Sequence, residues 1–542
     1  MKNIEIPYVK DRGRRYRFFE MLPGLLSWTI LALPFIFSFV YIEFVGIRMP
    51  VAALFIPAYL LMWFVKAIGL NIRSIQGFKT LHMHEKLPWD QLLEELRTGH
   101  VVQPERTIPT WHYENIRRIT EEPTPIKVDD VVHAIIIAAY NETREVLEPT
   151  IQSVIASVYD MKNVILVIAY EGRDGAQSEK AALELASEYG ATFKHTIAAK
   201  HPLTEKEVRG KGGNITYAAR KLEAYISQQK IDPLNVIVTT LDADNRPHKH
   251  YLNALTYLYA VTPDPLYVSY QPIPMFTNNI WDAPAPMRVI ATGNSFWNVV
   301  LSIRPHMIRN FSSHAQSMQA LVDTDYWSVR TIVEDGHQFW RTYFRYDGKH
   351  EVYPIYLPIY QDAVLSSTYL KTLKAQFVQL RRWAWGASDI AYVLEKGYFT
   401  NNKVPKLDLT FKFLRLLEGH VSWATAPLIL AFAAFIPLLF NPQDIAANQL
   451  PYIASRIQTI ALGGIFITLF LSLKLLPPKP KRYKKHRYIG MILQFILLPV
   501  TTILFNAFAA INSQTRLIFG RYLGKFDVTD KAVITEDKQK II

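Results

Sequence analysis

Long apolar runs near both ends of the chain constrain its fold more than any other feature. Residues 23–45 and 50–69 form two such runs, separated by a short polar turn around Arg48. Each approaches the roughly 20 residues that an α-helix needs to cross a bilayer. A cleaved signal peptide is disfavoured, because a second run follows at once and no small-residue cleavage site is evident. The sequence therefore predicts an N-terminal transmembrane hairpin over residues 1–71.

Further apolar runs lie in the last quarter of the chain. Two of them, at about 420–440 and 456–476, predict a transmembrane pair over residues 411–476. The last segment, residues 477–542, begins with a basic loop and contains an apolar run at 489–511 that Pro499 interrupts. A proline removes a backbone hydrogen bond, so this run could form a re-entrant or interfacial pair instead of a full span. We prefer the re-entrant interpretation.

The formal charge of +13 raises the question of nucleic-acid binding. Much of the excess, however, lies beside the apolar runs, in one cluster before the first run and another in the loop at 478–487. Basic clusters at the ends of spans are what the positive-inside rule predicts, so a membrane surface explains the charge better than a nucleic acid does. The chain contains no cysteine, which excludes a disulfide scaffold, a zinc–thiolate site and a thiol nucleophile.

The middle of the chain is typical of an α/β domain, because short apolar runs alternate there with polar, helix-like stretches. Residues 131–139, 164–169 and 236–241 predict strands, and residues 178–189 predict a helix. We therefore expect an α/β domain over residues 131–375. Residues 72–130 are mixed and amphipathic, and we expect them to form an interfacial connector.

Two carboxylates follow the predicted strand at 236–241. Asp242 and Asp244 stand one residue apart, and Pro247 comes shortly after them. Acids are costly inside a sheet but useful at its carboxyl edge, where α/β folds bind their ligands. Such a pair can share a Mg²⁺ or Mn²⁺ ion together with a substrate diphosphate. A solvated acidic turn is the alternative for a pair that stands alone.

Five further patches have the composition of a site, although each alone also fits an ordinary structural role. Tyr140-Asn141-Glu142 ends a predicted strand, and a polar turn of this kind can hold a base and ribose. The Gly-rich stretch 209–214 contains Lys211 and Asn214, and lacks the P-loop pattern. Glu334 and Asp335 precede a helical stretch and could accept a proton or simply cap the helix. The last two patches are Gln379, Arg382 and Trp383, on a helix predicted within residues 376–410, and Phe526, Val528, Thr529 and Lys531, in the C-terminal tail.

In this order and at these separations, the patches resemble the motifs of the membrane-embedded family-2 glycosyltransferases, which include cellulose, hyaluronan, chitin and mannan synthases. The resemblance spans roughly residues 130 to 531. It implies a GT-A-like (Rossmann-like) α/β domain in the cytosol, inserted between transmembrane α-helices of a multi-pass protein of the inner or plasma membrane.

The resemblance also implies a role for each motif. Asp242 and Asp244 would bind the metal and the nucleotide diphosphate, while Tyr140, Glu142, Glu171, Lys211 and Asn214 would line the donor pocket. Asp335, beside Glu334, would be the general base. Gln379 and Arg382 would close the donor site, and Trp383 would contact the acceptor sugar. Phe526, Val528, Thr529 and Lys531 resemble a gating loop that covers the bound nucleotide.

The sequence departs from the family pattern in two places. Family members usually carry Asp-Asp-Gly-Ser after the second strand, whereas this chain has Tyr170-Glu171-Gly172-Arg173. Either Glu171 or Asp174 could replace the aspartate that contacts the base, so the resemblance leaves both UDP and GDP as alternatives. The acid motif begins with Val333 instead of threonine, which matters less because Glu334 and Asp335 are retained.

The expected reaction is inverting, metal-dependent transfer of a sugar from a UDP- or GDP-linked donor to a glycan or glycolipid hydroxyl, with Mg²⁺ or Mn²⁺ as the cofactor. We expect a processive polysaccharide synthase. A single-addition enzyme acting on a lipid-linked or short glycan is the nearest alternative, and a non-catalytic membrane binding module or a transporter is a more distant one. A nucleic-acid binder is disfavoured, because the basic residues lie beside spans and form no aromatic-interleaved patch.

Overall fold

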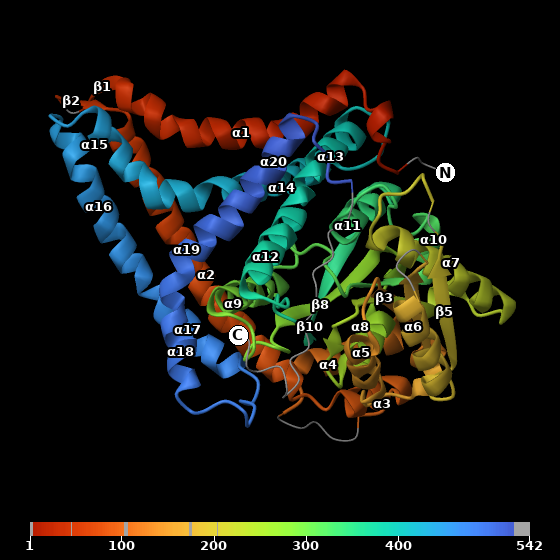
Figure 1. Cartoon of the computed structure of the whole chain (residues 1–542). Coiled ribbons are helices and arrows are strands. Elements are labelled where there is room, and N and C mark those ends of the chain that lie inside the picture. The colour runs from red at the N-terminus through yellow and green to blue at the C-terminus, as the bar shows by residue number, and fades with distance from the viewer. Residues whose placement is uncertain (1–3, 45, 102–106, 173–175, 203, 525–542) are drawn as a thin grey trace.

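The computed structural model describes residues 4–44, 46–101, 107–172, 176–202 and 204–524. An α/β domain formed by the middle of the chain lies beside long helices contributed by both ends (Figure 1). The expected mixed α/β domain flanked by long apolar helices is confirmed. The strands are β1 (Tyr41–Phe44), β2 (Ile47–Pro50), β3 (Val132–Ala139), β4 (Val164–Glu171), β5 (His195–His201), β6 (Val236–Asp242), β7 (Arg246–Pro247), β8 (Val268–Phe276), β9 (Ala315–Ser317) and β10 (Glu351–Gln361).

The helices fall into two groups. Those of the α/β part are α3 (Trp89–Thr98), α4 (Thr110–Glu121), α5 (Arg144–Ile155), α6 (Ala176–Tyr189), α7 (Lys211–Gln228), α8 (Tyr251–Val261), α9 (Ala285–Ser302), α10 (Met318–Asp323), α11 (Glu334–Arg345), α12 (Tyr369–Ala384) and α13 (Asp389–Tyr398). The apolar group comprises α1 (Arg14–Phe39), α2 (Ala52–Glu85), α14 (Lys406–Phe432), α15 (Ile436–Phe440), α16 (Ile445–Leu462), α17 (Gly464–Leu475), α18 (Arg487–Leu493), α19 (Leu498–Thr501) and α20 (Phe508–Ile518).

One eight-stranded sheet forms the centre of the α/β domain, in the order β5-β4-β3-β6-β9-β8-β10-β7. The first four strands are parallel to one another. The short strand β9 is antiparallel to both β6 and β8, and β10 runs parallel to β8. The carboxyl ends of β3, β4 and β6 therefore meet at one edge of the sheet, which is where open α/β sheets bind ligands.

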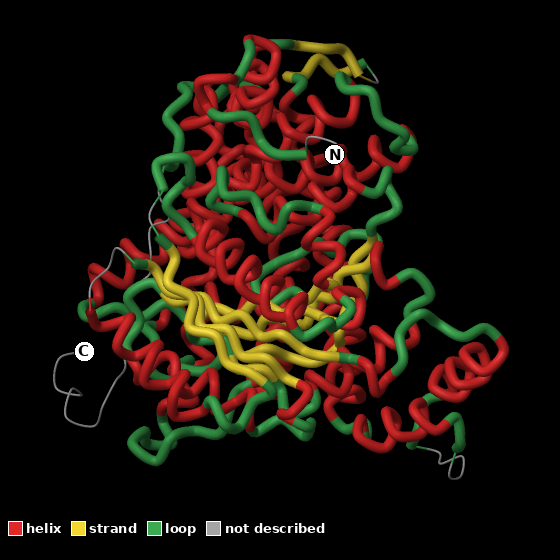
Figure 2. Tube along the Cα trace, turned by 90° about the vertical axis from the view of Figure 1, so that its right-hand side faces the viewer, coloured by secondary structure: helices red, strands yellow, loops and turns green. Residues whose placement is uncertain are grey.

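Helices cover both faces of this sheet (Figure 2), and its central strands β3, β4 and β6 are buried almost throughout. On β3, Ile135 and Ile137 pack in a core with α5, α6 and α8, while Ala134 and Ile136 pack in a second core with α7 and α10. Strands buried on both faces have no solvent side, and so they show no polar alternation. The three strands and the helix expected from the sequence all form, with ends that differ by at most two residues.

The expected interfacial connector at 72–130 is built differently. Its first part continues α2 without a break as far as Glu85, so a boundary at residue 71 falls inside a helix. Its second part, α3 and α4, packs on the α/β domain, and Trp89 and Leu92 belong to the same core as β3. The Trp89 indole donates to the carbonyl of His84 at 2.8 Å. The amphipathic faces of these helices are thus used for packing on the domain.

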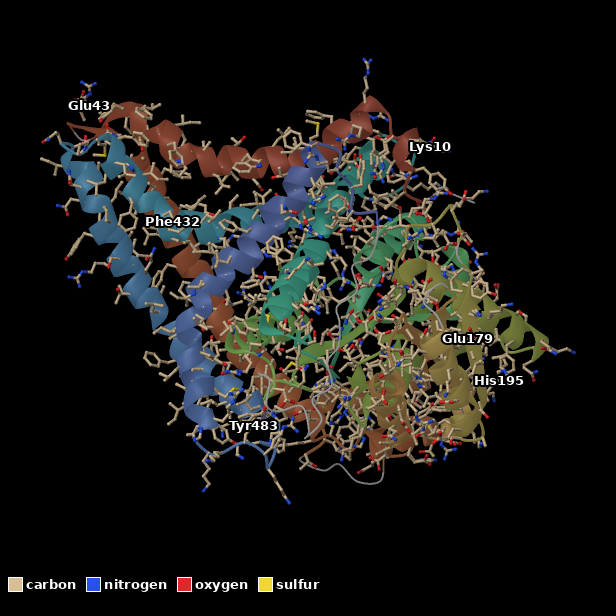
Figure 3. The ribbon with its side chains drawn as sticks, viewed as in Figure 1. Lys10, Glu43, Glu179, His195, Phe432 and Tyr483 are labelled. Carbon is tan, nitrogen blue, oxygen red and sulfur yellow. The ribbon has the colours of Figure 1, made fainter. Side chains whose placement is uncertain are left out.

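In the described part of the chain, five helical segments are long and apolar enough to cross a membrane, judged by length and composition. They are Arg14–Phe39, Ala52–Glu85, Lys406–Phe440, Ile445–Leu475 and Arg487–Ile518. The first ends earlier than the expected residue 45, because Tyr41–Phe44 and Ile47–Pro50 pair as a β-hairpin. Figure 3 shows Glu43 at this hairpin, far from Glu179 and His195 on the α/β domain.

The expected reversal at Pro499 does not occur. Pro499 lies in the first turn of α19, where its missing N–H breaks no helical hydrogen bond, and a 3₁₀ turn before it and a π turn after it keep the segment continuous. Both ends of this segment nevertheless contact the rest of the chain near the α/β domain. Arg487 donates to the carbonyl of Trp281 at 3.1 Å, and beyond the other end Tyr522 donates to Glu20 at 2.7 Å, near the start of α1. The chain therefore reaches the start of α1 at Tyr522 without a break in the helix before it.

Gly77 fixes how closely α2 approaches α9. A Cβ atom at this position would lie 2.6 Å from Cγ1 of Val299 and 2.8 Å from its backbone oxygen, which is too close for either backbone to remain in place. We predict that Gly77→Ala lowers the melting temperature of the full-length protein. Gly293→Ala on α9 is the matched control, because a Cβ there meets no atom within 4 Å and alanine favours a helix by about 1 kcal/mol. Equal melting temperatures for the two variants would contradict the close packing.

Candidate active site

The site lies where three neighbouring parallel strands end. Ala138 of β3 is in register with Asp242 of β6, and Ala139 of β3 is in register with Tyr170 of β4. The residues that follow these strands, among them Tyr140, therefore converge at one edge although they are far apart in the sequence. A cleft with a volume of about 1300 Å³, open to solvent, occupies this edge.

All predicted site residues in the described part of the chain line this cleft. They are Tyr140, Glu142, Glu171, Lys211, Asn214, Asp242, Asp244, Glu334, Asp335, Gln379, Arg382 and Trp383. The expected gating residues Phe526, Val528, Thr529 and Lys531, and Asp174, the competitor of Glu171, lie outside the described residues. The individual roles of the lining residues stay predictions.

The acidic pair after β6 is held from both sides. The Lys211 ammonium donates to Oδ1 of Asp242 at 2.7 Å, and the Ser312 hydroxyl donates to Oδ2 at 2.5 Å. Asp244 is largely buried, and its Oδ2 accepts from the backbone N–H of Asp362 at 3.0 Å. Both carboxylates are therefore positioned before any ligand arrives.

Lys211 is the first residue of α7, so most of the Gly-rich stretch 209–214 forms a helix N-terminus. Its glycines permit close packing. A Cβ at Gly212 would collide with the backbone oxygen of Ser328, and one at Gly213 would lie 2.6 Å from the Glu207 carboxylate. The Asn214 amide donates to the carbonyls that end β3 and β4, at 3.1 and 3.0 Å from Ala139 and Ala169. A helix N-terminus carries partial positive charge and unpaired N–H groups, which suit an anion.

Glu334 and Asp335 form the first turn of α11 and face the same cleft. Burial and the neighbouring Asp335 carboxylate raise the pKa of Glu334 to about 8. Burial also raises the pKa of Asp335, although the Lys211 ammonium opposes this shift. Burial alone would lower the pKa of Lys211, but the carboxylates of Asp242, Glu334 and Asp335 raise it above its usual value. One buried ammonium thus faces three carboxyl groups.

The opposite wall of the cleft comes from α12, which contributes Gln379, Arg382 and Trp383. The Gln376 amide donates to the side-chain oxygen of Gln379 at 3.1 Å. Trp383 lies against Phe276, with ring centroids 5.9 Å apart. An aromatic wall beside cationic and amide groups is the composition expected where a sugar ring and a phosphate meet.

At the end of β4, a histidine bridges two acids. Glu171 lines the cleft, and its carboxylate lies 3.3 Å from Nδ1 of His201, whose Nε2 lies 3.0 Å from Glu207. Burial lowers the pKa of His201, but the two carboxylates raise it to about 9. On the neighbouring strand, the Tyr140 backbone N–H donates to Glu142 at 2.6 Å. These contacts fix the acidic groups of the cleft end formed by β3 and β4.

The sequence interpretation missed several lining residues, notably Ser312, Phe276, Asn279 and Asp362. Asp362 directly follows β10, so the rule that identified the acids after β6 could also have found it. Ser312 had no such pattern. It lies in the segment between α9 and β9 and reaches Asp242 only because β9 pairs with β6 in the folded sheet.

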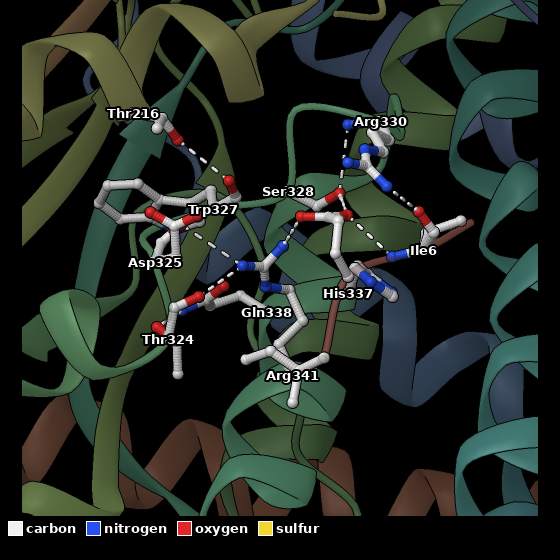
Figure 4. Close-up of polar contacts among 12 residues, drawn as sticks. Ile6, Thr216, Thr324, Asp325, Trp327, Ser328, Arg330, His337, Gln338 and Arg341 are labelled. Carbon is white, nitrogen blue, oxygen red and sulfur yellow. Dashed lines mark hydrogen bonds and ion pairs between the residues drawn. The ribbon is translucent and has the colours of Figure 1, made fainter. Parts of the chain in front are cut away.

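The segment 324–333, which leads into the acidic pair, is held by the extreme N-terminal part of the chain (Figure 4). The Ser328 hydroxyl donates to Glu5 at 2.5 Å, and the Glu5 carboxylate also forms an ion pair with the buried Arg341 of α11. Arg330 donates to the carbonyl of Ile6 at 2.9 Å. Burial would raise the pKa of Glu5, but Arg341 and Ser328 hold it below its usual value. Residues that precede the first long helix thus brace the loop that carries Glu334 and Asp335.

The oxygen ligands of the cleft fit a divalent metal bound together with a substrate. No group of three His, Asp or Glu side chains in the described ranges forms a complete metal site by itself. Mg²⁺ typically takes one or two carboxylates and completes its shell with water and substrate phosphates. Asp242 and Asp244 supply two such carboxylates in a cleft where negative charge exceeds positive charge. The residues therefore fit the expected Mg²⁺ or Mn²⁺.

The sequence matches no protein-family model and no curated protein. Among solved structures, the chain is similar to the mannosyltransferase PcManGT from Pyrobaculum calidifontis in complex with GDP-Man and Mn²⁺, at 14% identity over 75% of this chain and 98% of that chain, with a TM-score of 0.40. It is also similar to S. aureus TarS 1-349 in complex with UDP-GlcNAc, at 12% identity over 74% of this chain and 95% of that chain, with a TM-score of 0.35. We assign no substrate from likenesses at such low identity and score.

The bracing of the acidic loop predicts a role for Glu5. Glu5→Gln leaves the Arg341 guanidinium buried without its ion-pair partner, which for a buried pair costs roughly 3–5 kcal/mol and here less, because Glu5 is partly exposed. We expect a lower melting temperature for the full-length protein. Glu395→Gln, which removes an ion pair with the exposed Arg15, is the control and is expected to change the melting temperature little, because solvent screens such a pair. Equal effects of the two substitutions would show that Glu5 does not brace the loop.

The raised pKa of Glu334 predicts that replacing this residue with the neutral glutamine stabilises the protein more at high pH than at low pH. The folded state holds the Glu334 proton up to about pH 8, whereas the unfolded state releases it near 4.5. The stability that this group contributes is present below the lower value and is lost as the pH rises through 8. In metal-free protein, the free energy of unfolding of Glu334→Gln relative to that of the wild type should therefore rise by at least about 1.4 kcal/mol between pH 5 and pH 8.5. Urea unfolding at both pH values measures this gain, and a pH-independent difference would contradict it.

Proposed function

We propose that this protein is a membrane-embedded, metal-dependent glycosyltransferase that moves a sugar from a nucleotide-diphospho-sugar to a hydroxyl group of a glycan or glycolipid, with inversion. The main support is that motif residues from distant parts of the sequence line one cleft. Asp242 and Asp244, Lys211, the pair Glu334–Asp335 and the α12 residues all face it. A chance set of such motifs would be scattered over the surface.

The diphosphate of the donor binds among the positive groups of the cleft. Lys211, at the N-terminus of α7, and Arg382, on the opposite wall, supply the charges that bind phosphate oxygens. Asp242 and Asp244 hold Mg²⁺ or Mn²⁺, which when bound neutralises charge on the departing diphosphate. Catalysis in this scheme consists of positioning and electrostatic stabilisation, with no covalent enzyme intermediate.

Asp335 is the general base in our proposal. A base works best when its pKa lies near the working pH, and burial raises the pKa of Asp335 toward that range. The carboxylate removes the proton of the acceptor hydroxyl as that oxygen attacks the anomeric carbon, and the bond to the diphosphate breaks in line. Glu334 stays protonated below about pH 8 and therefore adds no second negative charge beside the base.

The nucleotide base and ribose bind at the cleft end formed by Tyr140, Glu142 and Glu171. His201 holds the Glu171 carboxylate in place, so Glu171 is our choice for the acid that contacts the base. Uridine and guanosine both carry N–H groups that can donate a hydrogen bond to a carboxylate. The sugar donor is accordingly UDP- or GDP-linked. Gln379 completes the donor wall.

The acceptor enters beside α12. Trp383 stacks on the acceptor sugar, and Ala384, one residue on, packs with Ala424 of α14 and Ala510 of α20. The acceptor end of the cleft therefore borders the apolar helices, as repeated addition to a polymer or addition to a lipid-linked glycan both require. We favour a processive polysaccharide synthase, and product length after incubation with labelled donor separates it from a single-addition enzyme.

The α/β domain faces the cytoplasm in this proposal. Basic residues precede α1 and fill the loop before α18, and the positive-inside rule places both there. The continuous segment α18–α20 starts and ends near the α/β domain, so in this proposal it lies along the membrane surface instead of crossing the bilayer, and the described chain ends on the same side as the donor cleft. No re-entrant pair at Pro499 is needed for this topology.

The base role gives a direct test. Asp335→Asn should lower turnover by at least about 100-fold, the low end of a general base's contribution, while UDP or GDP binding stays near that of the wild type. Release of free nucleotide from a panel of nucleotide sugars with Mg²⁺ or Mn²⁺ measures turnover, and calorimetry measures binding. Asp130→Asn is the control, because this exposed carboxylate precedes β3 and so lies at the end of that strand away from the cleft.

Retained turnover in Asp335→Asn would remove Asp335 from the base role. Absence of nucleotide release by the wild-type protein with every donor would favour a non-catalytic binding module or a transporter.

A further inference from the structure

A group of arginines gathers at the junction of α2, α14 and the segment after α9. Arg73 lies on α2, Arg304 and Arg309 follow α9, and Arg415 lies on α14. Within the described ranges, none of these four guanidiniums forms an ion pair, whereas nearby Lys66 and Lys412 are paired with Glu418 and Asp408. The acids of this region are thus already used by other cations.

Direct contacts bring the three elements together. Arg415 donates to the carbonyl of His306 at 3.0 Å, which joins α14 to the segment after α9. Gly77, one turn beyond Arg73, packs on Val299 near the end of α9, which joins α2 to the same region. The Arg309 guanidinium lies 4.1 Å above the Phe339 ring and is held there.

The arginines are close enough to repel one another. Burial, Arg73 and Arg415 all lower the pKa of Arg304. Burial lowers the pKa of His306, and so do all four guanidiniums. A cluster of like charges maintained by the fold is destabilising unless an anion joins it.

The depth of the cluster indicates which anion is available. Arg73 follows the apolar run that ends at residue 69, and Arg415 precedes the run that begins at about residue 420. At 1.5 Å per helical residue, both lie roughly 6–8 Å beyond the apolar part of their helices. This matches the headgroup layer, which extends about 5–8 Å beyond the hydrocarbon core on each side.

We propose that Arg73, Arg304 and Arg415 form a binding site for the phosphate group of an anionic phospholipid in the leaflet next to the α/β domain, with Arg309 behind them as a fixed positive charge. Guanidinium groups match phosphate oxygens in a two-pronged geometry, and an exposed Arg415 leaves the site open to the membrane surface. The inference rests on the membrane-embedded part of the proposed function and is independent of its chemistry.

Lipid retention by the purified full-length protein tests this site. The protein is equilibrated in mixed micelles of phosphatidylglycerol and phosphatidylcholine, and bound lipid is counted by native mass spectrometry. We expect Arg73→Gln/Arg415→Gln to weaken phosphatidylglycerol retention roughly 25-fold, at about fivefold for each surface cation lost. Arg73→Lys/Arg415→Lys keeps the charge and should retain most of the lipid.

Lys481→Gln/Lys484→Gln is the matched control, because it removes two exposed cations from the basic loop before α18. It should weaken phosphatidylglycerol retention clearly less than Arg73→Gln/Arg415→Gln does, because these two lysines lie outside the arginine cluster. The proposal would be overturned if Arg73→Gln/Arg415→Gln retained as much lipid as the wild type. It would also be overturned if Lys481→Gln/Lys484→Gln lost as much lipid as Arg73→Gln/Arg415→Gln. So would displacement of the lipid by inorganic phosphate at equal concentration, because the site would then take free phosphate. The readout needs no turnover, so its failure is distinct from failure of the catalytic proposal.

Discussion

The ion pair between Lys211 and Asp242 is the interaction on which the rest of the site depends. A single buried ammonium lies among the carboxylates of Asp242, Glu334 and Asp335, with Asp244 lining the same cleft. Without Lys211, the sheet edge would gather acidic groups with little to balance them, and burial would favour their protonation. With it, Asp242 stays available as an anion while the neighbouring acids keep a raised pKa. The remaining excess of negative charge is what a divalent cation would balance.

The fold supplies this arrangement through the ends of its elements. Three parallel strands end side by side, and the helix α7 begins with Lys211 at the point where β3 and β4 finish. Asn214 donates to the carbonyls of Ala139, at the end of β3, and Ala169, near the end of β4, and so joins these strand ends to the helix N-terminus. From the other side, the N-terminal residues around Glu5 brace the loop that carries the acidic pair. The acids are thus positioned by backbone and by buried contacts, as a preorganised site requires.

The apolar helices are joined to this site through few elements. α12 forms one wall of the cleft and packs against α14 and α20, while the segment α18–α20 contacts the α/β domain near both of its ends. In the proposed function, the face of α12 that lines the cleft would serve sugar transfer. Its other face, which packs on α14 and α20, would border the path of the product toward the membrane. The arginine cluster at α2 and α14 lies at a separate junction between the same two parts of the chain.

Much of this arrangement could be predicted from the sequence, because strand ends carry local patterns. Asp242, Asp244, Tyr140 and Glu171 all directly follow or end strands, and those strands form within two residues of their expected ends. The sequence could not reveal contacts that arise only from folding. Ser312 reaches Asp242 through the pairing of β9 with β6, and Glu5 reaches Arg341 across more than 300 residues. The continuity of α18–α20 was also missed, because proline at the start of a helical turn has no local penalty.

An experimental structure of the full-length protein with Mg²⁺ and UDP or GDP tests the central claim most directly. The account predicts the metal at about 2.0–2.1 Å from a carboxylate oxygen of Asp244 or Asp242. It also predicts the diphosphate between Lys211 and Arg382, with Asp335 facing the open side of the cleft. A nucleotide bound elsewhere, or a diphosphate remote from both Asp244 and Asp335, would contradict it.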